Sequence, residues 1–219
     1  MKQLCRLACV VAALALLFGC TKTPATVPTQ TQGGTTAPTP LPTETLSSAA
    51  TLSTCPPGSE SHVDRENGFS ACYPAGWKAS AYQDPEKKTQ GMDFVSPVPD
   101  ENTLPKRISV RIAAVGQITD TETVLQNLAM QLMTQRSQQG REIVAIRAFP
   151  IDGRKAVEDS LEGTVLVAGK PAAISGWVVG FPTDDRMWYI TVSGPGEARA
   201  EVENIYRQFL ASFRFVPRE

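Results

Sequence analysis

The chain has 219 residues, with 21 Lys and Arg against 22 Asp and Glu, and therefore a formal net charge of −1. This balance argues against non-specific nucleic-acid binding, because contact with phosphates needs a surplus of basic side chains. The only histidine, His62, leaves little material for metal ligation or for general-base chemistry at neutral pH. After the N-terminal segments are set aside, the remaining length suits one core and is too short for a second.

Residues 1–19 have the features of an export signal. A basic start precedes an unbroken apolar run over residues 7–18, which is shorter than the roughly 20 residues of a membrane span. The run ends in Leu17-Phe18-Gly19-Cys20, which resembles the lipobox of bacterial lipoproteins. The resemblance implies cleavage before Cys20, lipid (diacylglycerol and palmitate) on that cysteine, and anchoring to a bacterial membrane at the cell surface or the periplasmic side. The alternatives are a signal peptide cut elsewhere and a retained anchor.

Residues 20–54 start at the lipidated cysteine and continue as a low-complexity segment of Thr, Pro, Ala, Ser and Gln. Lys22 and Glu44 are its only charged residues. Such a composition cannot bury enough apolar surface to offset the entropy of ordering. We therefore expect a disordered, semi-extended tether between the membrane and a globular domain over residues 55–219. Thr/Ser-rich stretches with Pro are also typical of O-glycosylated stalks, so a bare spacer and a glycosylated one both remain open.

The globular part begins with a strand at residues 62–65, an Asn67-Gly68 turn of type I′, and a second strand that places Phe69, Ala71 and Tyr73 on one face. Thr119 and Glu122 have the spacing of a capping box for a helix that stops near Gly140. Further strands are expected at residues 92–95, 107–115, 142–149, 156–167, 172–181 and 187–193, and a last helix at 197–213. Because short turns join most of these strands, the sequence predicts an α+β fold with a mainly antiparallel sheet flanked by helices.

This pattern resembles the PsbP-like family, which includes the extrinsic photosystem II subunit. The residues that carry the resemblance are Phe69, Tyr73-Pro74-x-Gly76-Trp77, Phe94 with Ser96-Pro97, Gly153 before Ala156, Trp188-Tyr189-Ile190-Thr191 and Ser212-Phe213. The resemblance implies a PsbP-like α/β/α sandwich. It also implies a binding or assembly role without a catalytic site, and it assigns no ligand residue to this chain.

Two cysteines belong to the globular domain. After lipidation of Cys20, Cys55 and Cys72 are the thiols that remain in an exported chain, where disulfides persist. Cys72 lies on the strand face opposite Tyr73, so its partner must approach from the edge where Cys55 starts the domain. We expect a Cys55–Cys72 disulfide, and closing a loop of about 17 residues would stabilise the fold by roughly 3 kcal/mol.

Charged side chains on two long strands are the candidate partner-binding surface. Arg107 and Arg111 project from one strand, and Glu158, Ser160 and Glu162 project from another. If the strands are close, these residues form a mixed-charge face for a partner, because charge patterns set partner choice. The alternatives are a solvated sheet face and a face that lies under a helix with paired ions.

Other chemistry has little support. His62 beside Asp64 is expected to be a surface residue, and no Gly-x-Ser-x-Gly motif is present. Asp184 and Asp185, with Asp84 and Glu86, lack calcium-loop spacing and are expected to be solvated turn carboxylates. Trp77, Trp177 and Trp188 are expected in the core or as sheet cover rather than around a ligand. No metal or cofactor is expected.

The sequence predicts a membrane-anchored extracytoplasmic lipoprotein that is not an enzyme. It would have a binding or assembly role toward an unknown protein or small-molecule partner, and none toward nucleic acid. The alternatives are an envelope enzyme with an unrecognised site on the polar sheet face and a purely structural envelope component.

Overall fold

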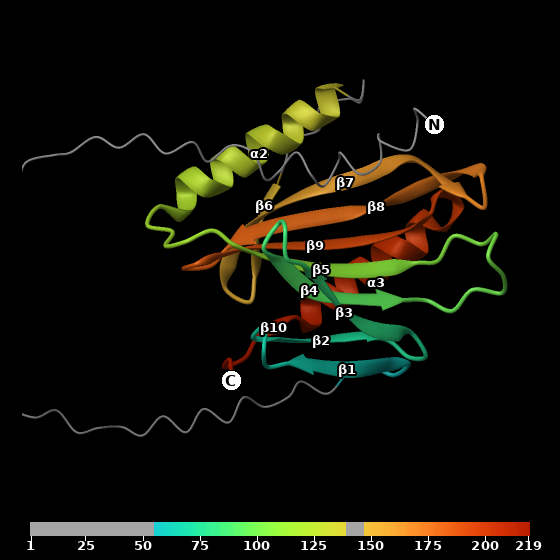
Figure 1. Ribbon diagram of the computed structural model, residues 1–219, viewed down its shortest axis with the longest axis horizontal. Helices are drawn as coiled ribbons and strands as arrows, with labels where there is room; N and C mark the ends of the chain where they lie inside the picture. Colours follow the sequence, from blue (N-terminus) through green and yellow to red (C-terminus); the bar gives the residue numbers. More distant parts are fainter. Residues whose placement is uncertain (1–54, 139–146) are drawn as a thin grey trace, which may run out of the picture. The chain divides into compact units, whose positions relative to one another are not determined.

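Two antiparallel sheets form the framework of the computed structural model, which describes residues 55–138 and 147–219 (Figure 1). The small sheet has the order β1 (Ser59–Asp64), β2 (Phe69–Pro74), β10 (Arg214–Phe215). The large sheet has the order β3 (Lys78–Asp84), β4 (Thr89–Val95), β5 (Arg107–Ala114), β9 (Arg186–Pro195), β8 (Lys170–Pro182), β7 (Arg154–Val167), β6 (Arg147–Ile151). Each strand pairing among the described residues is antiparallel.

The helices pack on opposite faces of the large sheet. α3 (Arg199–Ser212), which follows the short 3₁₀ helix η2 (Gly196–Ala198), packs with the small sheet on the face that we call the inner face. α2 (Thr121–Gln138) packs over β7 and β8 on the outer face. In Figure 1, α3 is partly hidden behind the strands of the large sheet, whereas α2 lies beside β6 and β7. The predicted α+β fold with helices flanking an antiparallel sheet is confirmed.

The inner core follows from the alternation along β5 and β2. Ile108, Val110 and Ile112 are buried, as are the small-sheet residues Phe69 and Tyr73. α3 contributes a stripe at helical spacing, namely Val202, Ile205, Tyr206, Phe209 and Leu210. Full burial of one such apolar side chain contributes about 1.5–3 kcal/mol, so this face carries most of the apolar stabilisation.

A second apolar cluster lies on the outer face, between α2 and the large sheet. Leu125, Leu128 and Leu132 recur at helical spacing and pack on Val157 and Met187. The sequence predicted one core, and the structure divides it between the two faces of one sheet. Both clusters belong to a single compact unit.

The Asn67-Gly68 and Asp152-Gly153 loops both connect hairpin strands, and only one of them is a type I′ turn. Asp152 and Gly153 join β6 to β7 with φ values of 43° and 79°, as a two-residue I′ turn requires. The predicted I′ turn at Asn67-Gly68 is wrong, because the loop between β1 and β2 spans four residues, 65–68. The Asp64 carboxylate accepts hydrogen bonds from the backbone and side-chain amides of Asn67, at 2.9 and 2.6 Å, and only Gly68 adopts a positive φ, 84°.

The start of α2 also differs from its prediction. Asp120, rather than Thr119, caps the helix, since its carboxylate accepts from the backbone N–H and hydroxyl of Thr123 at 3.0 and 2.7 Å. Glu122 instead forms an ion pair with Lys155 at 2.9 Å. Gly140, the predicted stop, lies outside the described residues, as does most of the strand predicted at 142–149.

β3 is a strand that the sequence did not predict. Its sequence, Lys-Ala-Ser-Ala-Tyr-Gln-Asp, lacks the large apolar residues that mark a half-buried strand. β3 forms the edge of the large sheet and pairs with β4 over its whole length. Polar edge strands of this kind resist pairing with other chains.

Candidate functional site

The four residues proposed from sequence to bind a partner do not share a face. Arg111 is in register with Tyr189 of β9, Gly180 of β8 and then Val157 of β7. Glu158 follows Val157 directly, and because side chains alternate along a strand it projects to the inner face. Arg107 and Arg111 thus lie on the outer face, and Glu158 and Glu162 lie on the inner face. The prediction of one mixed-charge surface is wrong, because two strands of unknown register lie between the two candidate strands.

Glu158 and Glu162 lie beside α3 as ion-pair partners. Glu158 is 3.0 Å from Arg207, with a side chain only 12% exposed, and Glu162 pairs with Arg199. Burial raises the pKa of Tyr206, and the nearby Glu158 carboxylate raises it further. These two glutamates therefore match the alternative reading of a sheet face under a helix with paired ions.

The outer face of β3, β4, β5 and β9 has a different character from the part under α2. Lys78, Ser80 and Arg107 are exposed there, and Tyr82 and Arg111 are half-buried. We call this surface the open face, and it comprises Lys78, Ser80, Tyr82, Asp93, Arg107, Ser109, Arg111, Thr191 and Ser193. Asp84, at the end of β3, is paired with Lys87 at 3.3 Å. Apart from this Asp84–Lys87 pair, the open face has three basic side chains and one acidic side chain.

A glycine between two strands positions the central arginine of the open face. Tyr82, Gly91 and Arg111 are in register across β3, β4 and β5. With no side chain between them, the Arg111 guanidinium lies 3.6 Å from the centre of the Tyr82 ring. Gly91 has a φ of 152°, and a Cβ built on it would come within 2.0 Å of the Val110 carbonyl oxygen. The close approach of β4 to β5 therefore requires glycine at this position.

Asp93 fixes the same guanidinium from the neighbouring row. Arg111 Nη2 donates to both carboxylate oxygens of Asp93, at 2.8 and 2.9 Å, and the Ser109 hydroxyl donates to Asp93 at 2.6 Å. Arg111 Nη1 donates to the Val110 carbonyl at 3.0 Å. Both bonds to Asp93 come from one guanidinium nitrogen and are charge-assisted, and the Arg111 side chain is only 19% exposed. Arg107, in contrast, is exposed and has no ion-pair partner among the described residues.

Sequence reasoning found the two arginines and missed Tyr82, Asp93 and Ser109. Their roles depend on the register of β3 with β4 and of β4 with β5, and β3 itself was not predicted. Cross-strand pairing is set by these registers, so the spacing of residues along one strand carries no signal for it.

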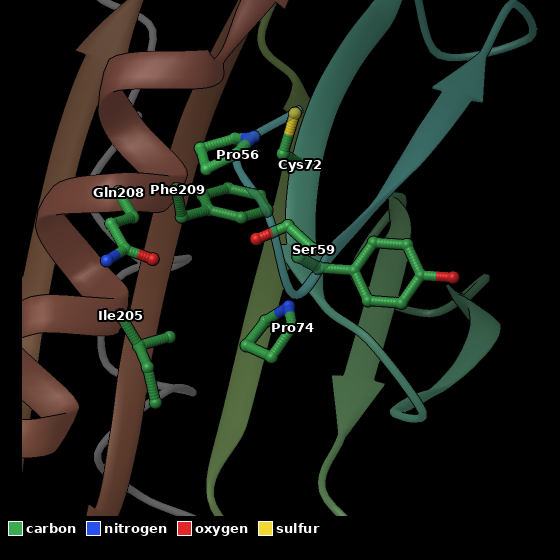
Figure 2. A pocket seen from close by; sticks show the side chains of 8 residues that line it. Pro56, Ser59, Cys72, Pro74, Ile205, Gln208 and Phe209 are labelled. Carbon is green, nitrogen blue, oxygen red and sulfur yellow. The ribbon is translucent and has the colours of Figure 1, made fainter. Parts of the chain in front are cut away.

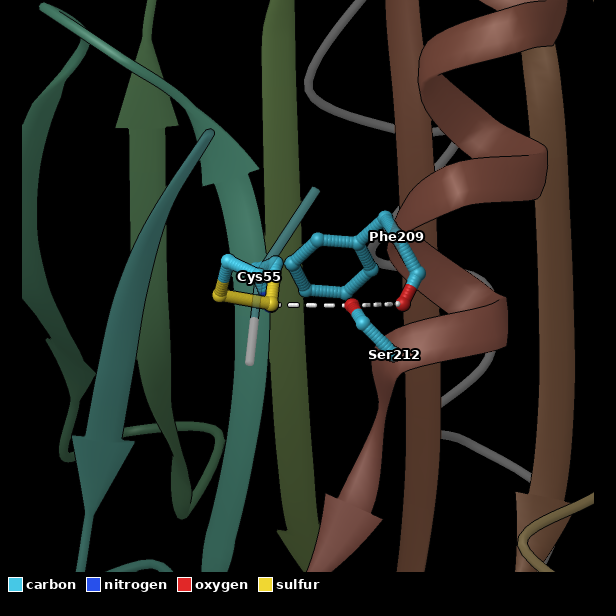
Figure 3. The surroundings of a disulfide bond; sticks show 4 residues. Cys55, Phe209 and Ser212 are labelled. Atoms are coloured by element: carbon cyan, nitrogen blue, oxygen red, sulfur yellow. Dashed lines mark hydrogen bonds between the residues drawn. A yellow bond between two sulfur atoms is a disulfide. The ribbon is translucent and has the colours of Figure 1, made fainter. Parts of the chain in front are cut away.

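Cys55 and Cys72 form a disulfide, with an S–S distance of 2.01 Å (Figure 3). The backbone N–H of Cys72 donates to the Ser212 hydroxyl at 2.9 Å, and that hydroxyl donates to the Phe209 carbonyl at 2.9 Å. The bond therefore joins the start of the domain to β2, next to the end of α3. The predicted pairing is present.

A crevice of about 10 Å³ lies beside this disulfide, between α3 and the start of the small sheet (Figure 2). Pro56, Pro74, Ile205 and Phe209 are among its lining residues. A volume of 10–15 Å³ is what one water molecule needs. The crevice is therefore too small for an organic ligand.

His62 is not the surface residue expected from sequence. It projects toward the core, with its ring centre 5.2 Å from that of Phe94 and 5.9 Å from that of Phe69. Burial lowers the pKa of His62, and the Asp64 carboxylate partly opposes this shift. These ring contacts and the lowered pKa indicate a neutral imidazole packed against the core. The pairing of β1 with β2 places His62 on the face that points inward.

Two other features were weighed from sequence. Within residues 55–138 and 147–219, no group of three or more His, Cys, Asp or Glu side chains is gathered around a possible metal position. Trp177 and Trp188 are buried in the inner core, and Trp77 packs against it while partly exposed, as expected.

Among the described helices, none is both long and apolar enough to cross a membrane.

No family model matches this sequence, and no curated protein matches it. Among solved structures, the fold is similar to cyanobacterial PsbP from Synechocystis, with a TM-score of 0.50 and 16% identity over 75% of this chain and 98% of that one. LpqN of Mycobacterium tuberculosis, which is involved in cell envelope biogenesis, matches with a TM-score of 0.44 and 14% identity, over 73% of this chain and 92% of that one. A Bacteroides thetaiotaomicron protein matches with a TM-score of 0.45 and 12% identity. The match spans 72% of this chain and 48% of that one.

The likeness to cyanobacterial PsbP shows the fold. Residues 55–219 have a PsbP-like α+β fold, as the motifs around Tyr73-Pro74 and Trp188 indicated. The identity of 16% is too low to transfer a partner or a site residue.

Proposed function

We propose that this protein is a lipid-anchored extracytoplasmic accessory protein that acts by binding and not by catalysis. Its globular domain docks an acidic partner protein through the open face. The observation that carries the proposal is the preorganised Arg111, fixed by Asp93 and Tyr82 on an exposed sheet surface next to the exposed Arg107.

The lipid anchor is supported by the sequence Leu17-Phe18-Gly19-Cys20 and by the tether that follows it. The Cys55–Cys72 disulfide is consistent with this location, because disulfides persist outside the cytoplasm. Two or more acyl chains on one cysteine give a stable membrane anchor. A protein held in this way meets its partners at the membrane surface.

The docking role is supported by the charges and the rigidity of the open face. Three basic side chains, Lys78, Arg107 and Arg111, outnumber the single carboxylate of Asp93. An acidic partner surface complements this charge, which raises the encounter rate and suppresses wrong partners. Because Arg111 is already ordered in the free protein, its immobilisation adds little to the entropic cost of docking.

Photo-crosslinking in intact cells tests the docking role. A photo-reactive amino acid replaces Ser80 on the open face, and in a second strain it replaces the exposed Thr164 of β7. We expect one defined crosslinked product from position 80 that is absent from position 164. Arg107→Glu should abolish the product, whereas Lys170→Glu, at the exposed turn between β7 and β8, should leave it intact. The same product from both positions, or a product that survives Arg107→Glu, would contradict the proposal.

Membrane fractionation tests the anchor separately. Cys20→Ala removes the acceptor sulfur, so we expect an unlipidated chain that is lost from the membrane fraction after processing. A Cys20→Ala chain that is processed and still fractionates with membranes would contradict lipid anchoring, and it would leave the docking result unaffected.

A further inference from the structure

A cleft of about 320 Å³ lies away from the open face, beside the turn between β8 and β9. None of its lining residues belongs to the open face. Its walls come from the β1–β2 loop, the β8–β9 turn with the start of β9, the start of β7, and Phe215 of β10 with the residues 216–218 that follow it. The volume is at the lower end of the range for small-molecule pockets, roughly 300–1,000 Å³.

The segment after β10 is held in place as one wall of this cleft. The Val216 N–H donates to the Gly68 carbonyl at 3.1 Å, and the Glu219 N–H donates to the Arg65 carbonyl at 3.2 Å. A Cβ on Gly68 would lie 2.7 Å from Cγ of Arg218, so this wall packs tightly only because residue 68 is glycine. Arg218 is thereby positioned at the rim of the cleft.

The opposite wall, the β8–β9 turn, is fixed by its backbone. The Thr183 N–H donates to the Arg186 carbonyl at 2.8 Å. The carbonyls of Asp184 and Asp185 accept from Ile118 and Val115, at 2.7 and 3.1 Å. These bonds from residues outside the turn fix the backbone of Asp184 and Asp185, both of which line the cleft.

Three arginines line the cleft with unused hydrogen-bonding capacity. Arg186 has a side chain only 18% exposed, and its buried Nη1 has no hydrogen-bond partner among the described residues. Its Nε lies 3.8 Å from Asp185, and Arg218 lies 3.7 Å from the same carboxylate, so both contacts exceed hydrogen-bond length. An anion in the cleft would supply hydrogen-bond acceptors to the guanidinium groups that line it.

The base of the cleft is aromatic. The rings of Trp188 and Phe215 meet edge to face with centres 5.4 Å apart, and the Trp188 indole N–H is already used by the Thr183 hydroxyl at 3.2 Å. The guanidinium of Arg154 lies 4.9 Å from the centre of the Phe215 ring. An apolar ring in the cleft would therefore contact other rings while its charged end meets the arginines.

The charges in the cleft select the type of anion. Three arginines and two aspartates leave a single net positive charge among the lining residues. A monoanion matches this charge, whereas a dianion brings a second negative charge close to Asp184 and Asp185. Guanidinium groups bind carboxylates in a planar, bidentate arrangement. We propose that this cleft binds a small aromatic carboxylate, with the carboxylate on Arg186 and Arg154 and the ring against the partly exposed Phe215.

Ligand-observed saturation-transfer NMR on the full chain in nonionic detergent tests this proposal. The probes are benzoate, the neutral isostere benzamide and the dianionic phenyl phosphate. We expect benzoate to bind with a Kd of about 1 mM or tighter, as suits a ligand of this size in a preformed cleft. Benzamide and phenyl phosphate should each bind at least about tenfold more weakly than benzoate. Benzamide has no negative charge, and phenyl phosphate has one more than the single net positive charge of the cleft.

Variants of the lining arginines locate the site. Arg186→Gln should weaken benzoate binding by about tenfold or more, since hydrogen bonds to charged groups are the strong ones. Arg154→Gln, at an exposed position where folding is not at risk, should weaken it about threefold to tenfold by the same reasoning. Arg199→Gln, on α3 and outside the cleft, is the matched control and should change the Kd by less than about twofold.

Three results would overturn the proposal. They are no benzoate signal at about tenfold above the expected Kd, equal binding of benzamide and benzoate, and equal loss of binding in Arg154→Gln and Arg199→Gln. Tighter binding of phenyl phosphate than of benzoate would replace the carboxylate by a phosphate. Crosslinking from Ser80 does not depend on this cleft, so failure here leaves the docking proposal standing.

Discussion

On the outer face of the large sheet, two glycines leave gaps that are filled in different ways. A single row of residues crosses it, from Tyr82 through Gly91 and Arg111 to Tyr189 and Gly180. Gly180 leaves a gap that Leu128 of α2 fills, with its Cδ2 only 2.6 Å from where a Cβ would lie. Gly91 leaves a gap that Arg111 and Tyr82 bridge from either side.

The difference between the two halves shows what each is suited to do. Under α2, apolar side chains are removed from water, which is the main source of stability. On the open face, Arg111, Asp93 and Ser109 satisfy one another while Arg107 stays exposed, so this half presents a polar surface without an exposed apolar patch. Four substitutions test this contrast, in order of decreasing effect.

The largest effect is expected in the covered half. Leu128→Ala should lower the free energy of unfolding by about 2–5 kcal/mol, because Leu128 is 4% exposed and its removal leaves a cavity between α2 and Gly180. Urea denaturation measures the change. Met130→Ala on the same helix, at a position 58% exposed, should change it by less than about 0.5 kcal/mol. Similar values for the two variants would mean that α2 is not held through Leu128.

A smaller loss is expected from the glycine of the open half. Gly91→Ala should cost about 3 kcal/mol, because alanine is strained at a φ of 152° and its Cβ would meet the Val110 carbonyl. The matched control is Gly163→Ala in β7, where the nearest atom to a new Cβ is 3.7 Å away. Thermal unfolding compares the two, and a neutral Gly91→Ala would show that β4 and β5 can separate without cost.

Replacing Arg111 should lower the free energy of unfolding by a smaller amount. Arg111→Lys keeps the charge but loses the second nitrogen's bond to the Val110 carbonyl and the stacking on Tyr82, so we expect a loss of about 1 kcal/mol. Arg107→Lys should be within about 0.5 kcal/mol of the wild type, because Arg107 is exposed. If chemical denaturation gave the same result for both, Arg111 would not be preorganised.

The smallest effect at neutral pH is expected at Tyr189, between the two halves. Burial raises the pKa of Tyr189 to about 12 from its usual 10.0. Because the folded state holds this proton more tightly, the stability from neutral Tyr189 is complete below pH 10 and is lost as the pH rises through 12. Tyr189→Phe should leave neutral stability nearly unchanged and reduce the loss above pH 10. Parallel pH–stability curves for the two proteins would contradict this assignment.

Most of the fold could be predicted because its signals are local. Alternation along β5, the helical spacing of Leu125, Leu128 and Leu132, and the Asp152-Gly153 turn each lie within a few residues of sequence. β3 was missed because an edge strand with polar residues has no such signal. The predicted type I′ turn at Asn67 is absent because the side chain of Asp64, three residues earlier at the end of β1, binds the loop.

The candidate site was predicted only in part, for a different reason. Arg107 and Arg111 follow from period two in one strand, whereas the face that they share depends on strand order. Val157 and Glu158 are neighbours in β7, yet Val157 lies on the outer face and Glu158 on the inner face. A shift of the β7–β8 register by one residue would exchange them. The sequence of one strand cannot supply that register when β8 and β9 lie between.

The disulfide decides how a mechanical load would enter the domain. A pull on the chain ahead of Cys55 reaches the Cys55 sulfur and passes directly to Cys72, so residues 56–71 form a slack loop that carries no tension. β1, at the edge of the small sheet, would otherwise be peeled off β2 one hydrogen bond at a time. The force is instead delivered to β2, the central strand of that sheet, beside the end of α3. A domain pulled from its N-terminal side therefore resists unzipping for as long as the sulfur–sulfur bond is intact.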